Sequence, residues 1–465
     1  MRQFRNIGLA FLLLLPAFTL GQTVREVFAF NSKLPSGGGG VTFIQGRSAK
    51  LYGSTSGFGL TNSGGSIVSM SIAGKADAVY TFSQTGIFSL GLTLATDGNF
   101  YGVVNDGGPS NSGLLFKVNS SGVYTPLYNF TGGSDGRYPD SSLIQASDGN
   151  LYGTTANGTV DDGTVYKYVP SAGKFTTIYS FNQNGLQGSS IFAPLTQAAD
   201  GNLYGTASAG GANGCGAIFS LTTSGEFLQA YSFPCGTGGN LPYGPLIQAS
   251  DGSFYGTTDA GGTITSKGEC VSGCGTVFRM SHGAVTILYR FSGAPTDGAG
   301  PLAGLVEGTD GNLYGGTYRG GTGDLGTLFQ ITTGGQYKLL YSFIDTVGSG
   351  MAAALAQHTN GKFYGNASYG GQSGAGSIYS LDMGLGLFIA LVRYTGRVGQ
   401  PVQILGQGLT GSTAVTINGV AATSFKVATD RYMTAVIPNG ATTGPVVVTT
   451  PKGTLTSNHS LRIVN

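Results

Sequence analysis

The sequence predicts an all-β protein, with a seven-bladed β-propeller closed by its N-terminal strand and followed by a small β-sandwich. Three observations predict this fold. The 465 residues include 83 glycines and 50 phenylalanines and tyrosines, a composition typical of turn-rich β-structure. A motif ending in Tyr-Gly recurs seven times at intervals close to 50 residues, and the repeat stops near residue 385, where the residue pattern changes.

The repeat is marked by sequences such as DGNLYG at 148–153. The motif tyrosines are Tyr52, Tyr101, Tyr152, Tyr204, Tyr255, Tyr314 and Tyr364, at intervals of 49, 51, 52, 51, 59 and 50 residues. The long interval contains Cys270 and Cys274, so we interpret its excess as a loop insertion. The third repeat divides into four short strands, at 142–146, 150–155, 163–169 and 174–181. Four antiparallel strands in about 50 residues are typical of a propeller blade.

The outermost strand of each repeat ends in an aromatic-x-Phe pattern. Six copies follow their own repeat, but the last repeat ends at 376–381 without one. The missing copy is VREVFAF at 24–30, ahead of the first repeat. We therefore expect this N-terminal strand to complete the last blade, which leaves no sheet edge exposed.

Residues 1–21 have the pattern of a signal peptide, with Arg2 and Arg5 before an apolar core at 7–15 and small residues ahead of Gln22. A retained N-terminal anchor is the alternative. No later segment reaches about 20 apolar residues, so no membrane span is expected in the mature chain. Export favours disulfides for the four cysteines, and the hairpin spacing pairs Cys215 with Cys235 and Cys270 with Cys274. A metal site there would lack ligands, since the nearest histidine is His282.

Residues 386–465 contain several short strands separated by Gly, Asn and Pro turns, which suits a small β-sandwich. The propeller is assigned to residues 22–385. The net charge of +2 and the low charged fraction of 9% exclude the basic footprint of a nucleic-acid-binding protein.

The repeat, seen in LIQASDGNLYGTT at 143–155 with its GTV-aromatic strand and Tyr-Ser-Phe ending, resembles the GloVer tandem repeat of exported bacterial proteins. Residues 415–422 (VTINGVAA) and 437–446 (IPNGATTGPV) resemble an IPT/TIG immunoglobulin-like domain. These resemblances imply a secreted or cell-surface protein, and they imply no established biochemical activity. Many members of the repeat family end in a surface-anchoring signal, whereas this sequence shows none.

No catalytic residue, metal ligand or cofactor site is predicted. The recurring Asp-Gly pair is interpreted as a two-residue hairpin turn, with a calcium or sialidase-type Asp motif as the alternative. His282, His358 and His459 are expected to lie far apart, which disfavours a zinc site or a catalytic triad. Two acidic positions are candidate ligand contacts. Glu307 is the one acid at a ring position that is otherwise mostly glutamine, and hydrogen bonding between blades is the alternative to a ligand contact there. Asp161 and Asp162 could form a carboxylate pair, and a solvated loop is the alternative.

Sequence differences between repeats concentrate in the loops opposite the Asp-Gly turns, which are rich in Gly, Ser, Asn, Asp and Tyr. Propellers commonly bind ligands on such a loop-bearing face. The sequence therefore favours an exported, non-catalytic recognition or adhesion protein that binds an extracellular glycan or a protein partner. The alternatives are a secreted hydrolase or lyase acting on polysaccharide and a structural envelope component. The oligomeric state is not predicted.

Overall fold

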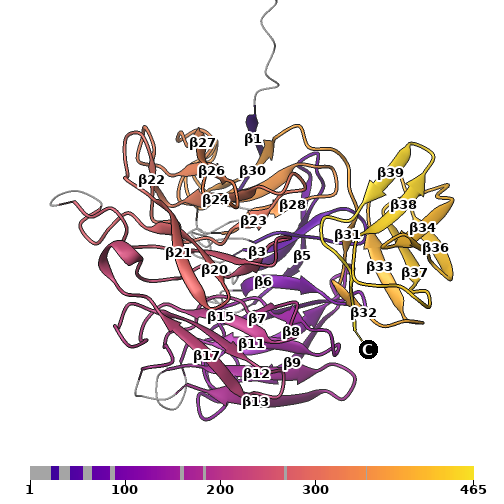
Figure 1. Cartoon of the computed structure of the whole chain (residues 1–465), viewed down its shortest axis with the longest axis horizontal. Coiled ribbons are helices and arrows are strands. Elements are labelled where there is room, and N and C mark those ends of the chain that lie inside the picture. Colours follow the sequence, from indigo (N-terminus) through magenta and orange to yellow (C-terminus); the bar gives the residue numbers. More distant parts are fainter. Residues whose placement is uncertain are drawn as a thin grey trace, which may run out of the picture.

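The computed structural model describes residues 22–30, 42–55, 65–83, 89–157, 162–181, 185–265, 270–351 and 353–464 (Figure 1). Over these ranges the chain is all-β, as predicted, with a single 3-10 turn, η1 (Gly236–Gly238). The predicted signal peptide, residues 1–21, lies outside the described residues. Within the described ranges, no helix has the length and hydropathy needed to cross a bilayer.

Seven four-stranded antiparallel sheets are formed by residues 23–382, and we number them in chain order. Sheets 1 to 3 contain β2 (Ile44–Gln45), β3 (Leu51–Thr55), β4 (Ser66–Met70) and β5 (Ala76–Thr81); β6 (Ser89–Leu94), β7 (Phe100–Val104), β8 (Leu114–Val118) and β9 (Tyr124–Asn129); and β10 (Ile144–Gln145), β11 (Leu151–Thr155), β12 (Thr164–Val169) and β13 (Lys174–Ser180). Sheets 4 and 5 contain β14 (Thr196–Gln197), β15 (Leu203–Ala207), β16 (Ala217–Leu221) and β17 (Phe227–Ser232); and β18 (Ile247–Gln248), β19 (Phe254–Thr258), β20 (Thr276–Ser281) and β21 (Ala284–Arg290). Sheet 6 contains β23 (Val306–Glu307), β24 (Leu313–Thr317), β26 (Thr327–Ile331) and β27 (Tyr337–Ser342), and a two-stranded sheet beside it pairs β22 (Gly298–Ala299) with β25 (Arg319–Gly320).

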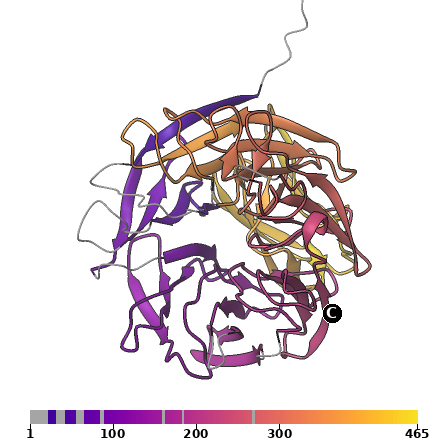
Figure 2. The same ribbon diagram turned by 90° about the vertical axis from the view of Figure 1, so that its left-hand side faces the viewer.

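Sheet 7 joins the two ends of this part of the chain. It contains β28 (Ala356–Gln357), β29 (Phe363–Ala367), β30 (Ser377–Asp382) and, as its outer strand, β1 (Thr23–Ala29). β1 pairs antiparallel with β30, from Thr23 opposite Asp382 to Ala29 opposite Ser377. The N-terminal strand therefore takes the place that the repeat pattern predicts for it. Figure 2 shows the sheets following one another around a ring, with β1 beside the last strands.

One hydrogen bond repeats between neighbouring sheets. The glutamine that ends an innermost strand accepts from a backbone N–H in the turn of the preceding sheet. Examples are Gln145 with Thr96 at 2.9 Å and Gln197 with Ser147 at 2.7 Å. Gln45 of sheet 1 accepts from the Thr359 N–H of sheet 7 at 2.9 Å, so the same hydrogen bond also links the first sheet to the last. Leu94 occupies this position in sheet 2 and has no side-chain acceptor. There, the Arg47 guanidinium instead donates to the Thr96 carbonyl at 2.9 Å.

The glycine of the Tyr-Gly motif is explained by the strand opposite it. Gly205 lies opposite Phe219, and a Cβ on this glycine would lie 2.4 Å from the ring. The equivalent pair in sheet 3 is Gly153 and Tyr166, where a Cβ would lie 2.4 Å from the phenol oxygen. Since an aromatic ring covers the position directly, only glycine fits without displacing the ring.

The Asp-Gly turns differ in one detail from the two-residue hairpin that the sequence suggests. In sheet 3 the Gly149 N–H donates to the Ala146 carbonyl and the Ala146 N–H to the Asn150 carbonyl, and only Gly149 has positive φ, at 83°. This is a three-residue turn with a glycine bulge. The Asp148 carboxylate accepts from the Asn150 N–H at 3.0 Å and from the Tyr152 hydroxyl at 2.7 Å. The motif aspartate and tyrosine therefore stabilise each other's positions.

The C-terminal segment, residues 386–464, forms two facing four-stranded sheets. One contains β31 (Ala390–Leu391), β33 (Pro401–Leu405), β37 (Tyr432–Val436) and β36 (Ser424–Thr429), and the other β35 (Val420–Ala421), β34 (Ala414–Ile417), β38 (Val446–Thr450) and β39 (Gly453–Thr456). β32 (Thr395–Gly396) pairs in parallel with β40 (Arg462–Ile463). Ile404 and Met433 of the first sheet and Ile417 and Val446 of the second share one buried core.

The C-terminal segment packs against the turns between the first and second strands of several sheets. The Arg47 guanidinium donates to the Gln403 amide oxygen at 2.7 Å and lies 4.6 Å from the Tyr432 ring. Leu405 joins the buried cluster of sheets 1 and 2, and Arg462 donates to the Ala198 carbonyl of sheet 4 at 2.9 Å. In Figure 1 this segment, in yellow, lies at one end of the ring.

Candidate functional site

The ring of sheets has two unlike ends. At the turn end, each sheet presents the turn between its first and second strands, which is Asp-Gly in sheets 2 to 6, and sheets 1 to 6 also present the hairpin turn between their third and fourth strands. The C-terminal segment covers part of this end. At the loop end, the described residues of sheets 3 to 7 include the loop between the second and third strands and the linker from the preceding sheet. The strand order places these linkers and loops at the same end, as the sequence predicts.

Glu307 lies at the turn end, on the short strand β23. Its carboxylate accepts from the Ser250 N–H at 2.9 and 3.1 Å and from the Ser250 hydroxyl at 2.5 Å. The side chain is buried, and burial raises the pKa of the carboxyl above its usual value. These contacts are those of the glutamines in the other sheets, so the structure places Glu307 in the series of bonds between sheets.

The other acidic candidates are only partly described. Asp161 lies outside the described residues, and Asp162 is a half-buried residue at the loop end, between β11 and β12. Both predicted disulfides are present. Cys215–Cys235 has a Cα–Cα distance of 5.4 Å and Cys270–Cys274 one of 4.6 Å.

The three histidines lie in separate places. His358 is fully buried in the turn of sheet 7, where Nε2 lies 3.0 Å from the Ala49 carbonyl and Nδ1 accepts from the Asn360 N–H at 3.1 Å. Burial lowers the pKa of His358. His459 packs beside Tyr394 in the C-terminal segment, and His282 lies in an exposed turn. Among the described residues, no three His, Cys, Asp or Glu side chains gather as a metal site would require.

The loop end has a regular backbone frame. In sheets 3, 4, 5 and 7 the incoming linker forms a β-bridge with the loop of the same sheet, at Arg137–Asn157, Ser189–Ala209, Asn240–Ala260 and Ser349–Tyr369. In sheet 6 the same contact is the pairing of β22 with β25. This frame holds different side chains at equivalent positions from sheet to sheet.

One such position lies five residues before the inner glutamine or glutamate. It is occupied by Asp140, Phe192, Tyr243 and Leu302 in sheets 3 to 6. The Phe192 and Tyr243 rings are neighbours, with centroids 5.9 Å apart and planes 42° apart. Phe192 remains 38% exposed, although it is a large apolar side chain. Two adjacent linkers therefore present an aromatic pair at the loop end.

Asp140 occupies the same position in sheet 3. Burial raises the pKa of its carboxyl to about 6, a hydrogen bond with the Asn105 side chain lowers it, and the nearby charge of Asp106 raises it further. Asn105 and Asp106 follow the second strand of sheet 2. Sheets 2 and 3 thus bring two carboxyl groups and an amide together at the loop end.

Sheets 5 to 7 add a third group of side chains. Asp259, whose pKa is raised by burial, interacts with the positive charge of Arg319. The Tyr318 and Tyr369 hydroxyls share a hydrogen bond, and Tyr369 is 49% exposed. Gly350 lies behind these two tyrosines, where a Cβ would be 3.0 Å from the Tyr318 ring and 3.1 Å from the Tyr369 ring. Aromatic faces, carboxylates and a guanidinium therefore follow one another around the loop end.

Sequence reasoning did not single out these residues because it followed the part of each repeat that recurs from copy to copy. A usable signal was present in the linkers. When the inner glutamines are aligned, the position five residues earlier changes from acidic to aromatic to aliphatic, while the leucine two residues before the glutamine is unchanged in sheets 3 to 7.

Comparison with models of protein families identifies the repeat. A family model described as the Gloeobacter/Verrucomicrobia repeat matches residues 17–198, 89–270 and 262–413, which together span most of the sequence. The chain belongs to the Gloeobacter/Verrucomicrobia repeat family. A search of curated proteins gives no match.

Solved structures show a related fold at low sequence identity. A fungal alcohol oxidase of the AA5 family, in complex with copper, has a TM-score of 0.54 and 12% identity, with 95% of this chain and 98% of that chain covered. The extracellular domain of the B. thetaiotaomicron protein BT4673 has a TM-score of 0.52 and 13% identity, with 92% of this chain and 52% of that chain covered. The chain thus spans about half the length of the second structure. These neighbours are β-propeller-like, and the likeness concerns the fold alone.

Proposed function

We propose that this member of the repeat family is an exported, non-catalytic recognition protein that binds an extracellular glycan at the loop end. In this proposal residues 1–21 are a signal peptide, residues 22–385 are a seven-bladed β-propeller closed by β1, and residues 386–465 are an IPT/TIG-like immunoglobulin-like domain. The seven sheets, the Gln45–Thr359 bond and the pairing of β1 with β30 support the propeller. The two facing sheets around a shared core support the immunoglobulin-like domain. The two disulfides and the repeat family fit an extracellular location.

The observation that carries the proposal is the contrast between the two ends. The C-terminal segment occupies part of the turn end through Arg47, Gln403 and Arg462, whereas exposed side chains such as Phe192 and Tyr369 leave the loop end open to solvent. At the open end, the aromatic pair Phe192–Tyr243 and the half-exposed Tyr369 offer flat apolar faces.

This set of side chains favours a glycan over a protein partner. Aromatic faces pack against the C–H faces of sugar rings, and carboxylate and amide groups such as Asp140 and Asn105 pair with sugar hydroxyls. Binding sites of this kind combine apolar walls with a few polar groups that fix orientation. Asp162 lies at the same end and belongs to the proposed surface. A ligand role for Glu307 would compete with its bonds to Ser250, so we do not place it in the binding surface.

The test is binding of residues 22–465 to a glycan and polysaccharide array, followed by product analysis of every ligand that binds. We expect binding without turnover, and a loss of about tenfold or more in affinity for Phe192→Ala, because a central aromatic contact commonly contributes at least that much. Val123→Ala is a matched control, since Val123 is an exposed apolar side chain in an outer hairpin turn at the turn end.

Each other outcome would overturn the proposal in a different way. Turnover of a bound polysaccharide would show an enzyme. Equal losses for Phe192→Ala and Val123→Ala would show that the loop end is not the binding surface. Absence of any glycan binding would leave a protein partner or a structural role in the cell envelope as the function.

A further inference from the structure

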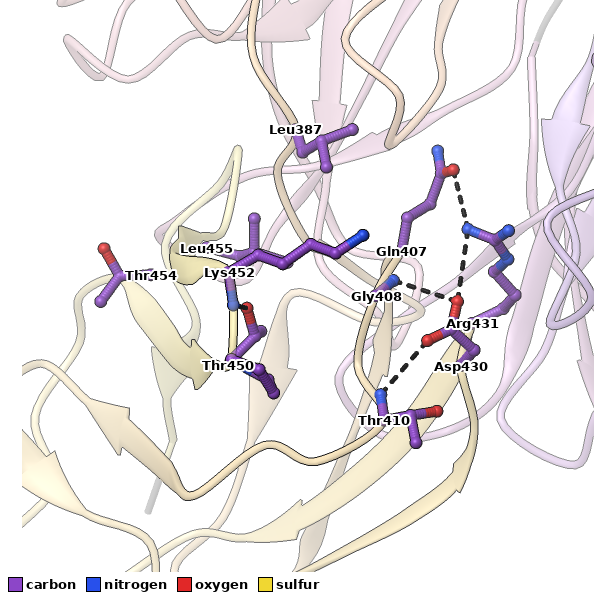
Figure 3. A pocket seen from close by; sticks show the side chains of 11 residues that line it. Leu387, Gln407, Gly408, Thr410, Asp430, Arg431, Thr450, Lys452, Thr454 and Leu455 are labelled. Carbon is purple, nitrogen blue, oxygen red and sulfur yellow. Dashed lines mark hydrogen bonds and ion pairs between the residues drawn. The ribbon is translucent and has the colours of Figure 1, made fainter.

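A second concave site lies in the C-terminal segment, away from the loop end. Its cavity of about 500 Å³ is lined by Leu387 ahead of β31, the loop after β33, the turn between β36 and β37 and the hairpin of β38 and β39 (Figure 3). A cavity of this size holds a small organic ligand such as a mono- or disaccharide. The site is separate from the residues of the proposed loop-end surface.

Two cations face this cavity, and only one carboxylate is beside them. Arg431 donates to the Gln407 amide oxygen at 2.8 Å and lies 3.6 Å from the Asp430 carboxylate. Lys452 extends from the turn between β38 and β39 toward Gln407 and Arg431 (Figure 3), and it forms no ion pair with any described residue. The lining therefore carries one net positive charge.

The carboxylate of Asp430 is already used by the protein. It accepts from the Gly408 N–H at 3.2 Å and from the Thr410 N–H at 3.3 Å, and these bonds lower its pKa. Asp430 therefore holds the loop after β33 and one side of Arg431 in place. The remaining Arg431 nitrogens and the Lys452 ammonium can pair with an anion from outside, because a guanidinium presents several donors in a fixed plane.

The rest of the lining sets the chemical class of that anion. The Leu387 side chain is 49% exposed, and Leu455 lies on the other wall, so both offer apolar contacts. The hydroxyl of Thr454 and the amide of Gln407 offer polar contacts to neutral groups. One net positive charge beside apolar and hydroxyl-pairing groups matches a ligand with a single carboxylate, several hydroxyls and C–H faces.

We propose that this cavity binds a uronic-acid residue of an acidic polysaccharide, with its carboxylate between Arg431 and Lys452. The site would give the protein an anchoring point on acidic polysaccharide that is independent of any ligand at the loop end. Binding would also weaken as salt rises, since both cations are partly exposed to solvent.

The experiment is calorimetric titration of residues 22–465 with trigalacturonate, with the uncharged trigalactose as the comparison ligand, at 50 and 300 mM NaCl. We expect trigalacturonate alone to bind, with an affinity at least threefold weaker at the higher salt. Lys452→Gln should lower the affinity about tenfold, because it removes one charge and leaves the other contacts. Arg431→Gln should lower it at least as much.

Lys426→Gln is the matched control, because Lys426 is an exposed lysine on β36 outside the cavity. It should change the affinity less than twofold, and Phe192→Ala should leave it unchanged. The proposal is overturned if trigalacturonate does not bind, if the uncharged sugar binds equally, or if Lys426→Gln weakens binding as much as Lys452→Gln. Failure of the loop-end proposal would instead show in the array experiment, where Lys452→Gln should leave binding of uncharged glycans unchanged.

Discussion

Asp140 makes the stability of the protein depend on pH in a direction that a single substitution can test. Its carboxyl is mostly buried at the loop end, and burial raises the pKa to about 6 from a usual value of 3.8. In the substitution Asp140→Asn, the carboxyl is replaced by an amide of the same shape that stays uncharged at every pH. The Asn105 side chain can still form a hydrogen bond with it.

The sign follows from which state binds the proton more tightly. Because the folded-state pKa is the higher one, the stabilising contribution of Asp140 is complete below pH 3.8 and is lost as the pH rises through 6. A difference of about 2 pKa units, at 1.36 kcal/mol per unit, corresponds to about 3 kcal/mol in total, most of which is lost between pH 4 and pH 7. Asp140→Asn should therefore be more stable than the wild type at pH 7, by about 2–3 kcal/mol, and nearly equal to it at pH 4.

The assay is urea unfolding of both proteins at pH 4, 5, 6 and 7, followed by tyrosine fluorescence and circular dichroism. Two neighbouring substitutions give opposite controls. Asn105→Ala removes a bond that lowers the Asp140 pKa and should steepen the wild-type pH dependence, whereas Asp106→Asn removes a nearby like charge and should flatten it. A stability difference between wild type and Asp140→Asn that is constant from pH 4 to pH 7 would refute the reasoning.

Substitutions at three further places test the contacts of Tyr166, Glu307 and the Cys215–Cys235 bridge. Tyr166→Phe should leave the stability unchanged or raise it by about 1 kcal/mol, because the buried Tyr166 hydroxyl has no hydrogen-bond partner and sheets 4, 5 and 6 have phenylalanine at this position. Thermal unfolding measures the difference. A loss of about 1 kcal/mol or more would show that the hydroxyl does form a hydrogen bond. Glu307→Gln should keep the bond to Ser250, so its stability at pH 7 should match or exceed that of the wild type. Glu307→Leu leaves the Ser250 N–H unpaired and should lower the free energy of unfolding by about 1–3 kcal/mol. Equal effects of the two changes in chemical unfolding would contradict the inter-sheet role of Glu307. Replacing Cys215 and Cys235 together by serine should lower the free energy of unfolding by about 3 kcal/mol, since the disulfide joins residues 20 apart in the sequence. The comparison is with the wild type under non-reducing conditions. An unchanged midpoint of urea unfolding would argue against a stabilising disulfide.

The sequence predicted the sheets well because the residues that determine strand pairing lie within each repeat. The Asp-Gly turn, the tyrosine four residues after the aspartate and the glycine covered by an aromatic ring are local features that recur about every 50 residues. Seven copies in register confirm one another, and a strand missing from one end could be found at the other, as β1 was. The lengths of the inner strands were predicted less well. The strand expected at 142–146 contains only Ile144–Gln145. Ala146 already belongs to the turn, and the Leu143 carbonyl accepts from the Thr93 hydroxyl of sheet 2.

The candidate site was harder to predict because it depends on contacts between repeats. Glu307 stood out in the sequence as the exception in a ring of glutamines, yet the structure gives it the same partner that a glutamine would have. Phe192 and Tyr243 did not stand out, because each is an ordinary residue in a variable linker until the frame of bridges brings the two rings together.

This difference has a physical basis in how a ring of repeats uses its residues. Positions that are the same in most copies are occupied by bonds within and between sheets, as the Asp148–Tyr152 and Gln145–Thr96 bonds show, and so they have little left to offer a ligand. Positions that differ between copies are not needed for pairing, because the backbone bridges form with any side chain. In such a fold, binding residues should therefore be sought where equivalent positions differ in chemistry and remain exposed. Phe192 and Tyr369 meet both conditions, whereas Glu307 meets only the first.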